Sequence, residues 1–230
     1  MRAHLKRISS PKTWPIERKG TVFVTRPLPG KKLQYSISLN LALQKLGYAQ
    51  NSKEAKSILN AGQVLLDGKK ATDYRRMVGL MDVLSLPSAD KYYRLLMVQS
   101  GKLDFVEIDK KEASFKPVKI TNKTTITGKK LQLNTFDSRS IEITEDNYKV
   151  NDSVKLKLPE QKIEDTYKFE KGNVVYLIGG SYVGRSGVLK EVEGNKIYVE
   201  IEGQVQETSK KYAYMVGKNK PAITLTNSKE

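Results

Sequence analysis

The sequence predicts an α+β protein built from several small domains, with two short helices followed by a long series of β-strands. Apolar residues recur at helical spacing within residues 38–62, whereas short runs of strand-forming residues between turn residues continue from about residue 92. A chain of 230 residues with 38% hydrophobic content suits two or three small cores better than one large core.

A basic segment precedes the predicted helices. Residues 1–35 contain nine Lys or Arg and one acid, so they carry +8 of the net charge of +16. Four prolines and little apolar periodicity indicate an extended arm that does not fold on its own. Because ordering such an arm costs conformational entropy, a polyanion is its expected partner, most commonly nucleic acid. The candidate RNA-binding residues of the arm are His4, Lys6, Arg7, Lys12, Trp14, Arg26, Lys31 and Lys32.

The two ring-bearing candidates of the arm have alternative interpretations. His4, the only histidine of the chain, is interpreted as a stacking or hydrogen-bonding contact to RNA, with an incidental exposed side chain as the alternative. Trp14, the only tryptophan, lies among cations, as rings that stack on bases do. A tryptophan also commonly anchors an arm to its own domain, so both interpretations of Trp14 stay open.

Two helices are expected between residues 38 and 62. The apolar positions of the first helix and the glycine that ends it are Leu39, Ala42, Leu43, Leu46 and Gly47. The second helix begins at Asn51, because Glu54 three residues later completes a capping-box pattern. Gly62 is placed to end this second helix.

Strands and cations follow the second helix. Val64–Leu66 and Val83–Leu86 are predicted strands, and Asp67-Gly68 is a predicted tight turn. Lys53 and Lys56 share the helix face opposite the apolar stripe, where they suit the phosphates that flank an RNA groove. An ordinary solvated face is the alternative interpretation. The candidate RNA-binding residues here are Lys53, Lys56, Lys69, Lys70, Arg75 and Arg76.

The rest of the chain is predicted to be β. The expected central strands are Tyr93–Val98, Phe105–Ile108, Val118–Ile120, Leu131–Leu133, Ile141–Ile143 and Val154–Leu158. The acidic stretch Gln161–Asp165 is a predicted linker. The last block has the strand spacing of a small barrel, with strands at Val174–Ile178, Gly187–Leu189, Ile197–Ile201, Gln204–Glu207 and Ile223–Leu225.

A glycine-rich loop lies inside this last block. Four glycines within residues 179–187 indicate positive backbone φ angles or a close backbone approach, and Arg185 places a long cation at the turn. Glycines that merely permit a barrel corner are the alternative. The candidate RNA-binding residues of the block are Gly180, Gly184, Arg185, Lys218 and Lys220.

Composition argues against several kinds of site. The chain has no cysteine and one histidine, which excludes disulfides, thiolate catalysis and typical zinc sites. We find no pair of carboxylates placed for acid–base chemistry, so we expect no catalytic residue, metal or cofactor. The sequence also lacks an apolar signal segment and any run approaching the ~18 apolar residues of a membrane span.

Two stretches resemble known RNA-associated modules. Residues 51–69, with a helix cap, a terminating glycine and a Val-x-Leu-Asp-Gly turn, resemble the alpha-L RNA-binding domain shared by bacterial ribosomal protein four, pseudouridine synthases and some tyrosyl-tRNA synthetases. The loop at residues 179–189 resembles the KOW motif of ribosomal proteins and transcription elongation factors.

Taken in order, further motifs resemble one family, the archaeal and eukaryotic small-subunit ribosomal protein four of the e-type. Leu80 and Phe136 depart from residues common in that family. The matching segments are His4–Trp14, Gly79–Leu86, Thr135–Ile141, Asn151–Val154, Gly179–Val188 and Gly217–Pro221.

The resemblance implies a structural constituent of the small ribosomal subunit, in the cytoplasm, that binds small-subunit rRNA beside neighbouring ribosomal proteins and has no enzymatic activity. An RNA-modifying enzyme and a transcription elongation factor are the alternatives. The implied domains are a basic extension (1–37), an alpha-L domain (38–98), a central β domain (99–168) and a KOW-bearing SH3-like barrel with a tail (169–230).

Overall fold

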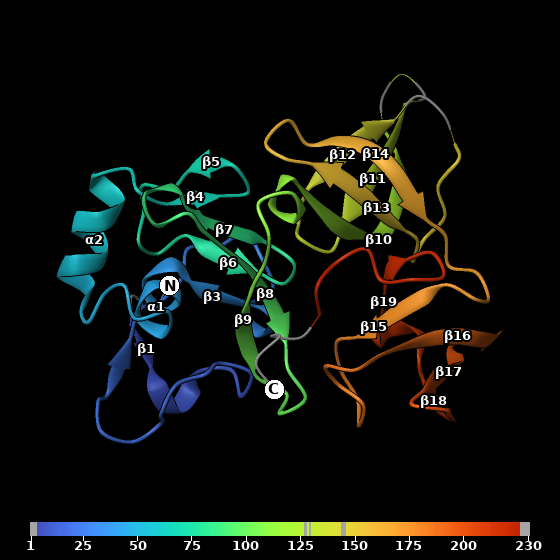
Figure 1. Ribbon diagram of the computed structural model, residues 1–230, viewed down its shortest axis with the longest axis horizontal. Coiled ribbons are helices and arrows are strands. Elements are labelled where there is room, and N and C mark those ends of the chain that lie inside the picture. The colour runs from blue at the N-terminus through green and yellow to red at the C-terminus, as the bar shows by residue number, and fades with distance from the viewer. Residues whose placement is uncertain (1–3, 127, 129, 144–145, 226–230) are drawn as a thin grey trace. The chain divides into compact units, whose positions relative to one another are not determined.

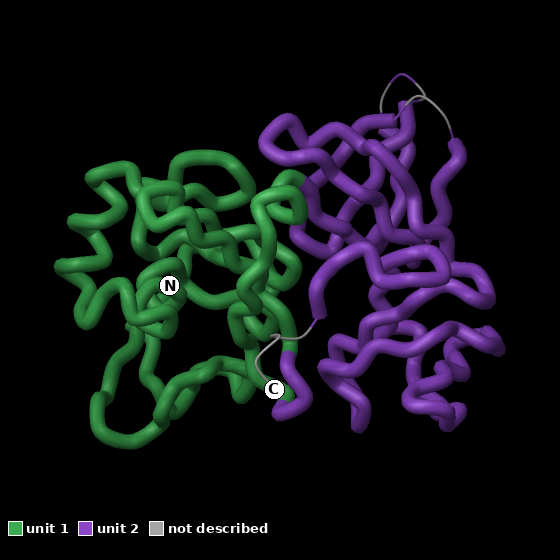
Figure 2. The backbone as a smooth tube through the Cα atoms, viewed as in Figure 1, with its two compact units in different colours: residues 1–97, 101–114 green, residues 98–100, 115–230 purple. Residues whose placement is uncertain are grey.

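The computed structural model describes residues 4–225 apart from 127, 129, 144 and 145 (Figure 1). The chain divides into two compact units: unit 1 comprises residues 1–97 and 101–114, and unit 2 comprises residues 98–100 and 115–230 (Figure 2). The described residues contain two α-helices, both in unit 1, together with many β-strands. The predicted α+β class is therefore confirmed.

Both predicted helices form. Helix α1 spans Leu39–Lys45, and helix α2 spans Ser52–Asn60. The Asn51 side chain caps α2 by accepting two backbone N–H groups, and the Glu54 carboxylate accepts the N–H of residue 50 at 2.7 Å. Gly62 follows α2 with a φ of +72°, a conformation that favours glycine. These helix ends are local in sequence, which is why the pattern of residues predicts them.

Unit 1 also contains short antiparallel strands. Their bounds are β1 Leu5–Lys6, β2 Phe23–Val24, β3 Ser36–Ser38, β4 Leu65–Leu66, β5 Lys69–Lys70, β6 Met77–Gly79, β7 Val83–Leu86, β8 Lys91–Met97 and β9 Leu103–Glu107. The main sheet has the order β5-β4-β7-β8-β9, and β1-β2 and β3-β6 form two short pairs. The predicted turn at Asp67-Gly68 joins β4 to β5, with both φ angles positive.

The basic segment is part of unit 1, which corrects the expectation of an arm without a core. Trp14 is only 2% exposed, and its indole N–H donates to the Leu33 carbonyl at 3.1 Å. The Thr13 carbonyl accepts the N–H of Leu103 in β9 at 2.7 Å. Arg18 donates to two backbone carbonyls of the same segment. Of the two interpretations of Trp14, the structure supports the anchor.

Unit 2 contains two five-stranded antiparallel sheets. The first has the order β12-β11-β10-β13-β14 and buries Val118, Ile120, Leu133, Val154 and Leu156. Its strands are β10 Phe115–Thr125, β11 Leu131–Thr135, β12 Ser140–Ile143, β13 Ser153–Lys157 and β14 Lys162–Tyr167. The predicted linker at residues 161–165 is wrong, because most of this stretch lies in β14 and pairs with β13.

The second sheet of unit 2 has the order β18-β17-β16-β15-β19. Its strands are β15 Val174–Leu177, β16 Ser186–Glu193, β17 Lys196–Ile201, β18 Gln204–Ser209 and β19 Ala213–Gly217. The predicted strand Ile223–Leu225 does not form. Strand β19, which the sequence analysis missed, pairs with β15 instead, and Ile223 is buried without strand pairing.

Buried polar contacts join the two sheets of unit 2. Lys119 in β10 is 4% exposed, and its ammonium donates to three backbone carbonyls of residues 210–213. The Tyr214 hydroxyl in β19 donates to the Pro117 carbonyl at 3.1 Å. The predicted domain boundary at residue 168 therefore falls inside one compact unit.

We expect Trp14→Ala to destabilise unit 1 strongly, because it empties a buried site and leaves the Leu33 carbonyl without its donor. The free energy of unfolding should fall by about 3–5 kcal/mol. Urea unfolding followed by circular dichroism measures this change without relying on the only tryptophan. Ile8→Ala, at a side chain that is 74% exposed, is the control and should change it by less than about 0.5 kcal/mol. Equal losses in the two variants would contradict the anchoring role.

Candidate nucleic-acid interface

Two cations lie on the solvent-facing side of α2. Ala55 and Leu59 are fully buried, whereas Lys53 and Lys56 are exposed, as their spacing predicts. The Lys56 ammonium lies 4.5 Å from the centre of the Tyr74 ring, within the range of a cation–π interaction. This contact fixes the direction of the Lys56 side chain and keeps its charge at the surface.

The β1-β2 pair brings further predicted residues to the same place. A hollow of about 250 Å³ is lined by His4 and Arg26 from the basic segment and by Lys56, Tyr74 and Arg75. Four of these five residues are predicted RNA contacts, and they come from three separate stretches of sequence. The structure therefore gathers cations and rings around one concave site in unit 1.

Hydrogen bonds beneath the hollow hold these stretches together. The backbone N–H of Leu28 donates to the Arg75 carbonyl at 2.9 Å. Asn40, which is 2% exposed, donates from its amide to the Thr25 hydroxyl at 2.7 Å and to the Ser52 hydroxyl at 3.1 Å. The amide of one α1 residue thus ties the basic segment to the start of α2.

Several other predicted cations of unit 1 are exposed but do not line this hollow. They are Lys6, Lys12, Lys32, Lys53, Lys69, Lys70 and Arg76. Lys6 lies on β1, so it is close in sequence to His4. The Lys70 side chain lies against Gly62, at the carboxyl end of α2.

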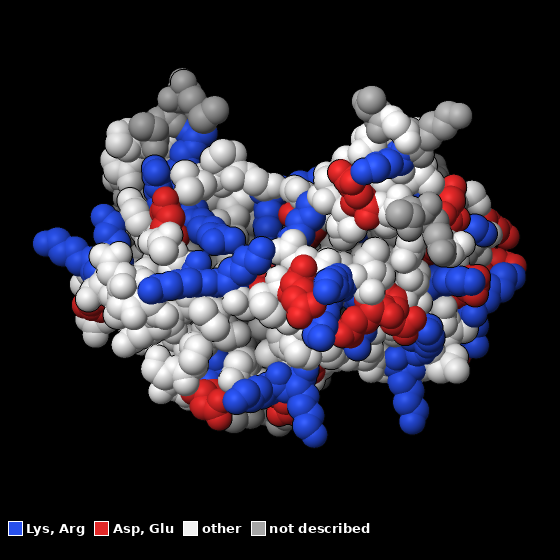
Figure 3. Space-filling view, turned by 90° about the horizontal axis from the view of Figure 1, so that it is seen from above, with Lys and Arg blue, Asp and Glu red and all other residues white. Residues whose placement is uncertain are grey.

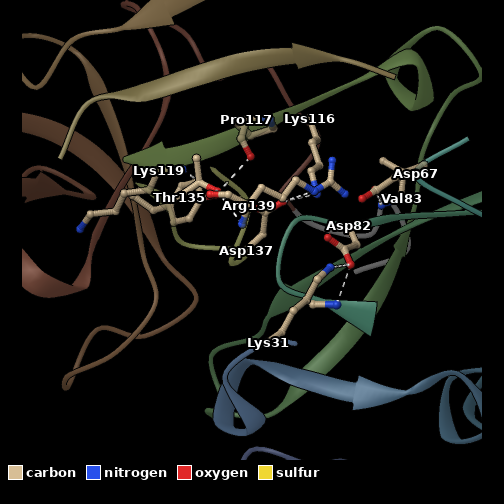
Figure 4. A network of polar contacts seen from close by, with 12 residues as sticks. Lys31, Asp67, Asp82, Val83, Lys116, Pro117, Lys119, Thr135, Asp137 and Arg139 are labelled. Carbon is tan, nitrogen blue, oxygen red and sulfur yellow. Dashed lines mark hydrogen bonds and ion pairs between the residues drawn. The ribbon is translucent and has the colours of Figure 1, made fainter. Parts of the chain in front are cut away.

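Two further predictions for unit 1 need correction. The Lys31 ammonium pairs with the buried Asp82 carboxylate, which also accepts the Gly79 N–H at 2.7 Å (Figure 4). Lys31 and Trp14 are therefore occupied inside unit 1, and we withdraw both from the set of predicted RNA contacts. Arg7 is half-buried and donates to the Glu17 carbonyl at 2.9 Å, so it also helps to fold the segment.

The glycine-rich loop of unit 2 has a packing explanation. A Cβ at Gly179 would collide with the Tyr212 ring, and a Cβ at Gly187 would collide with the backbone of β17. Gly180 and Gly184 have φ angles of +84° and +78°. The corner between β15 and β16 thus requires Gly179, Gly180 and Gly184, and the packing of β16 against β17 requires Gly187, so none of the four by itself indicates a bound ligand.

The cationic candidates of unit 2 have acidic partners or lie exposed. The Arg185 guanidinium is 3.5 Å from the Glu202 carboxylate, and its side chain is 38% exposed. Lys218 donates to both carboxylate oxygens of Asp165, and this contact holds the pKa of Asp165 below its ordinary value. Lys220 is exposed.

The charge pattern differs between the two units on the face shown in Figure 3. Lys and Arg predominate over the side occupied by unit 1, whereas Asp and Glu lie beside many of the cations of unit 2. On the second sheet, Lys190 and Lys196 each pair with a glutamate on a neighbouring strand, and Lys171, in the turn before β15, pairs with Glu191 of β16. The more open cationic surface therefore belongs to unit 1.

Sequence reasoning missed two residues of the interface. Tyr74 lies beneath Lys56, and Phe23 lines the same hollow from β2. The run of β-branched and aromatic residues Val22–Val24, between Gly20 and Pro27, is the signal that could have revealed a short strand there. No comparable signal marks Tyr74, because its position depends on contacts between distant stretches.

The described residues contain no group of three His, Asp or Glu side chains placed to hold a metal ion. Among the same residues, no helix is long and apolar enough to cross a membrane.

Comparison with known proteins defines the class of this chain. Residues 39–84 match the S4 domain, an RNA-binding domain, and this range contains α1, α2, β4 to β6 and the start of β7. Residues 1–30 match the RS4NT (NUC023) domain, and residues 89–163 match the ribosomal family S4e. The cationic hollow thus joins the basic segment to an RNA-binding domain.

Relatives cover nearly the whole chain. Small ribosomal subunit protein eS4 of Methanosphaera stadtmanae is 42% identical over 97% of this chain and 96% of the relative. The protein of the same name from Methanococcus maripaludis is 38% identical, covering 97% of this chain and 98% of the relative. The crystal structure of 30S ribosomal protein S4e from Thermoplasma acidophilum aligns with a TM-score of 0.70 at 28% identity, covering 80% of this chain and 96% of that one.

The chain belongs to the small ribosomal subunit protein eS4 family. This family consists of ribosomal structural proteins and not of enzymes. The predicted family is therefore confirmed, and the RNA-modifying alternative is excluded.

Arg185→Ala should weaken RNA binding more than Lys196→Ala. Arg185 lies at the loop corner and is free to exchange its contact with Glu202 for a phosphate, whereas Lys196 lies on a strand beside Glu207 at 2.6 Å. We expect a loss of about tenfold for Arg185→Ala, measured by filter binding to small-subunit rRNA, as for one hydrogen bond to a charged group. Equal effects of the two substitutions would remove the reason for treating the loop as a contact site.

Proposed function

We propose that the chain binds and stabilises small-subunit ribosomal RNA as a structural component of the small subunit, beside neighbouring ribosomal proteins. The observation that carries the proposal is the hollow in unit 1, where His4, Arg26, Lys56 and Arg75 converge around Tyr74. Positive side chains with an adjacent ring suit a phosphate backbone and its nucleotides. The names of the relatives support the same assignment.

We also propose that the predicted domains act as successive RNA-binding modules. The S4 match at residues 39–84 supports the alpha-L domain predicted at residues 38–98. The five strands β15–β19, with a glycine-rich corner between the first two, support a KOW-bearing SH3-like barrel in residues 169–230. Residues 226–230 of its predicted tail lie outside the described part of the chain.

Sedimentation tests the proposed role in the cell. A native lysate of the source cells is run through a sucrose gradient at low and at high salt, and this protein is followed across the fractions. We expect it to migrate in a one-to-one ratio with the small subunit. Migration at the top of both gradients would contradict the proposal, and co-migration with RNA polymerase would favour the elongation-factor alternative.

Salt dependence tests the electrostatic mechanism. If the chain neutralises about 6–10 phosphates, its affinity for small-subunit rRNA should fall by roughly 10³- to 10⁵-fold between about 50 and 200 mM salt, taking the slope for duplex DNA. Lys56→Ala should reduce the slope of log affinity against log salt by about one. Lys162→Ala is the matched control, because Lys162 is an exposed cation of unit 2 beside Glu160 at 3.3 Å. A flat salt response would contradict the mechanism.

A further inference from the structure

Residues in and beside the β1-β2 pair line two hollows of unit 1 that differ in chemistry. The first is the cationic hollow at Lys56 and Arg75. The second, of about 1140 Å³, is lined mainly by apolar side chains, including Ile8, Pro27 and Leu33. The same four residues, His4, Leu5, Phe23 and Arg26, line both hollows. They therefore border both a cationic site and an apolar site, and are called the wall below.

The wall itself exposes aromatic surface. Phe23 is 56% exposed, and its ring centre lies 5.5 Å from that of His4, with the two rings tilted by 50°. Ile8 is 74% exposed and Leu33 is 37% exposed at the edge of the apolar hollow. Large apolar side chains grouped in this way and bordered by cations usually mark a binding surface.

We infer that this wall binds an unpaired nucleotide of the RNA, with the base in the apolar hollow against Phe23 and His4 and a phosphate on the side of Arg26, Lys56 and Arg75. The inference rests on the proposed RNA-binding function. A nucleotide joins a flat apolar base to an anionic phosphate, which matches the two hollows that the wall borders. Unpaired bases stack on aromatic side chains in RNA recognition, whereas the bases of a duplex are already stacked on one another.

An acidic peptide with apolar side chains is the competing occupant. The aromatic pair favours a nucleotide, because a planar base gains most from a ring surface. The basic segment, residues 1–35, also carries a net charge of +8, which is far more than one acidic side chain needs for binding. We therefore assign the site to RNA and treat a protein segment as an outcome of the test.

Phe23→Ala separates base contacts from phosphate contacts. The full chain is titrated with small-subunit rRNA of the source organism, transcribed in vitro, over a series of salt concentrations. We expect Phe23→Ala to weaken binding by about 5- to 150-fold, as for the loss of one stacked base. The slope against salt should stay unchanged, since no phosphate contact is lost. Val205→Ala is the matched control, because Val205 is 57% exposed on β18 in unit 2.

Ultraviolet crosslinking of the wild-type complex provides the second readout. Adducts between a base and Phe23 or His4, located by mass spectrometry, would support the inference. If the wild-type chain binds, Phe23→Ala binds with the same affinity and adducts form only at other residues, the inference is overturned. The proposed function is kept in that case. If Phe23→Ala binds naked rRNA normally but fails to enter small subunits, the inference is also overturned. A protein segment is then the occupant of the apolar hollow. No binding by the wild-type chain would overturn the proposed function itself.

Discussion

The packing of the basic segment against its own domain is the constraint on which the interface depends. The cations of this segment repel one another, and few acids are available nearby to offset them. Burial of Trp14 offsets this repulsion, because burying a large aromatic side chain contributes a few kcal/mol to the free energy of unfolding. Arg7 and Arg18 direct their guanidinium groups to backbone carbonyls, which satisfies these carbonyls and fixes the path of the chain. On that path Arg26 lines the same hollow as Lys56 of α2.

In unit 2, lysine side chains are buried inside the fold. Lys116 is fully buried and pairs with Asp137 at 2.8 Å, and Arg139 contacts the same carboxylate at 3.0 Å (Figure 4). Lys119 is likewise enclosed by carbonyl groups. Burying such charges adds little net stability compared with an apolar core, but it leaves few acceptable alternative pairings of β10. Cations thus take part in the fold of both units, and unit 1 in addition gathers several of them around one surface hollow.

The sequence predicts those elements whose causes are local. The cap at Asn51 and the positive-φ turn at Asp67-Gly68 depend on neighbouring residues, and both are confirmed. A local run of strand-forming residues marks β2, but its pairing with β1 and that of β19 with β15 depend on partners far along the chain, so spacing alone does not reveal these pairs. For the same reason the predicted set of cations includes Lys31, whose distant partner Asp82 could not be known from spacing.

The structure weakens the interpretation of the glycine-rich loop of unit 2 as a ligand site. Four glycines in a short loop suggest a close approach by a ligand, yet side-chain packing and positive φ angles account for all four. Arg185 is then the remaining argument for an RNA contact at that loop. The nearby Glu202 carboxylate partly neutralises the Arg185 charge. In the hollow of unit 1, Arg75 lies 3.9 Å from the Asp73 carboxylate, but Lys56 rests on a ring and not on a carboxylate. We therefore expect the dominant electrostatic contact with RNA to lie in unit 1, where the basic segment meets the S4 domain.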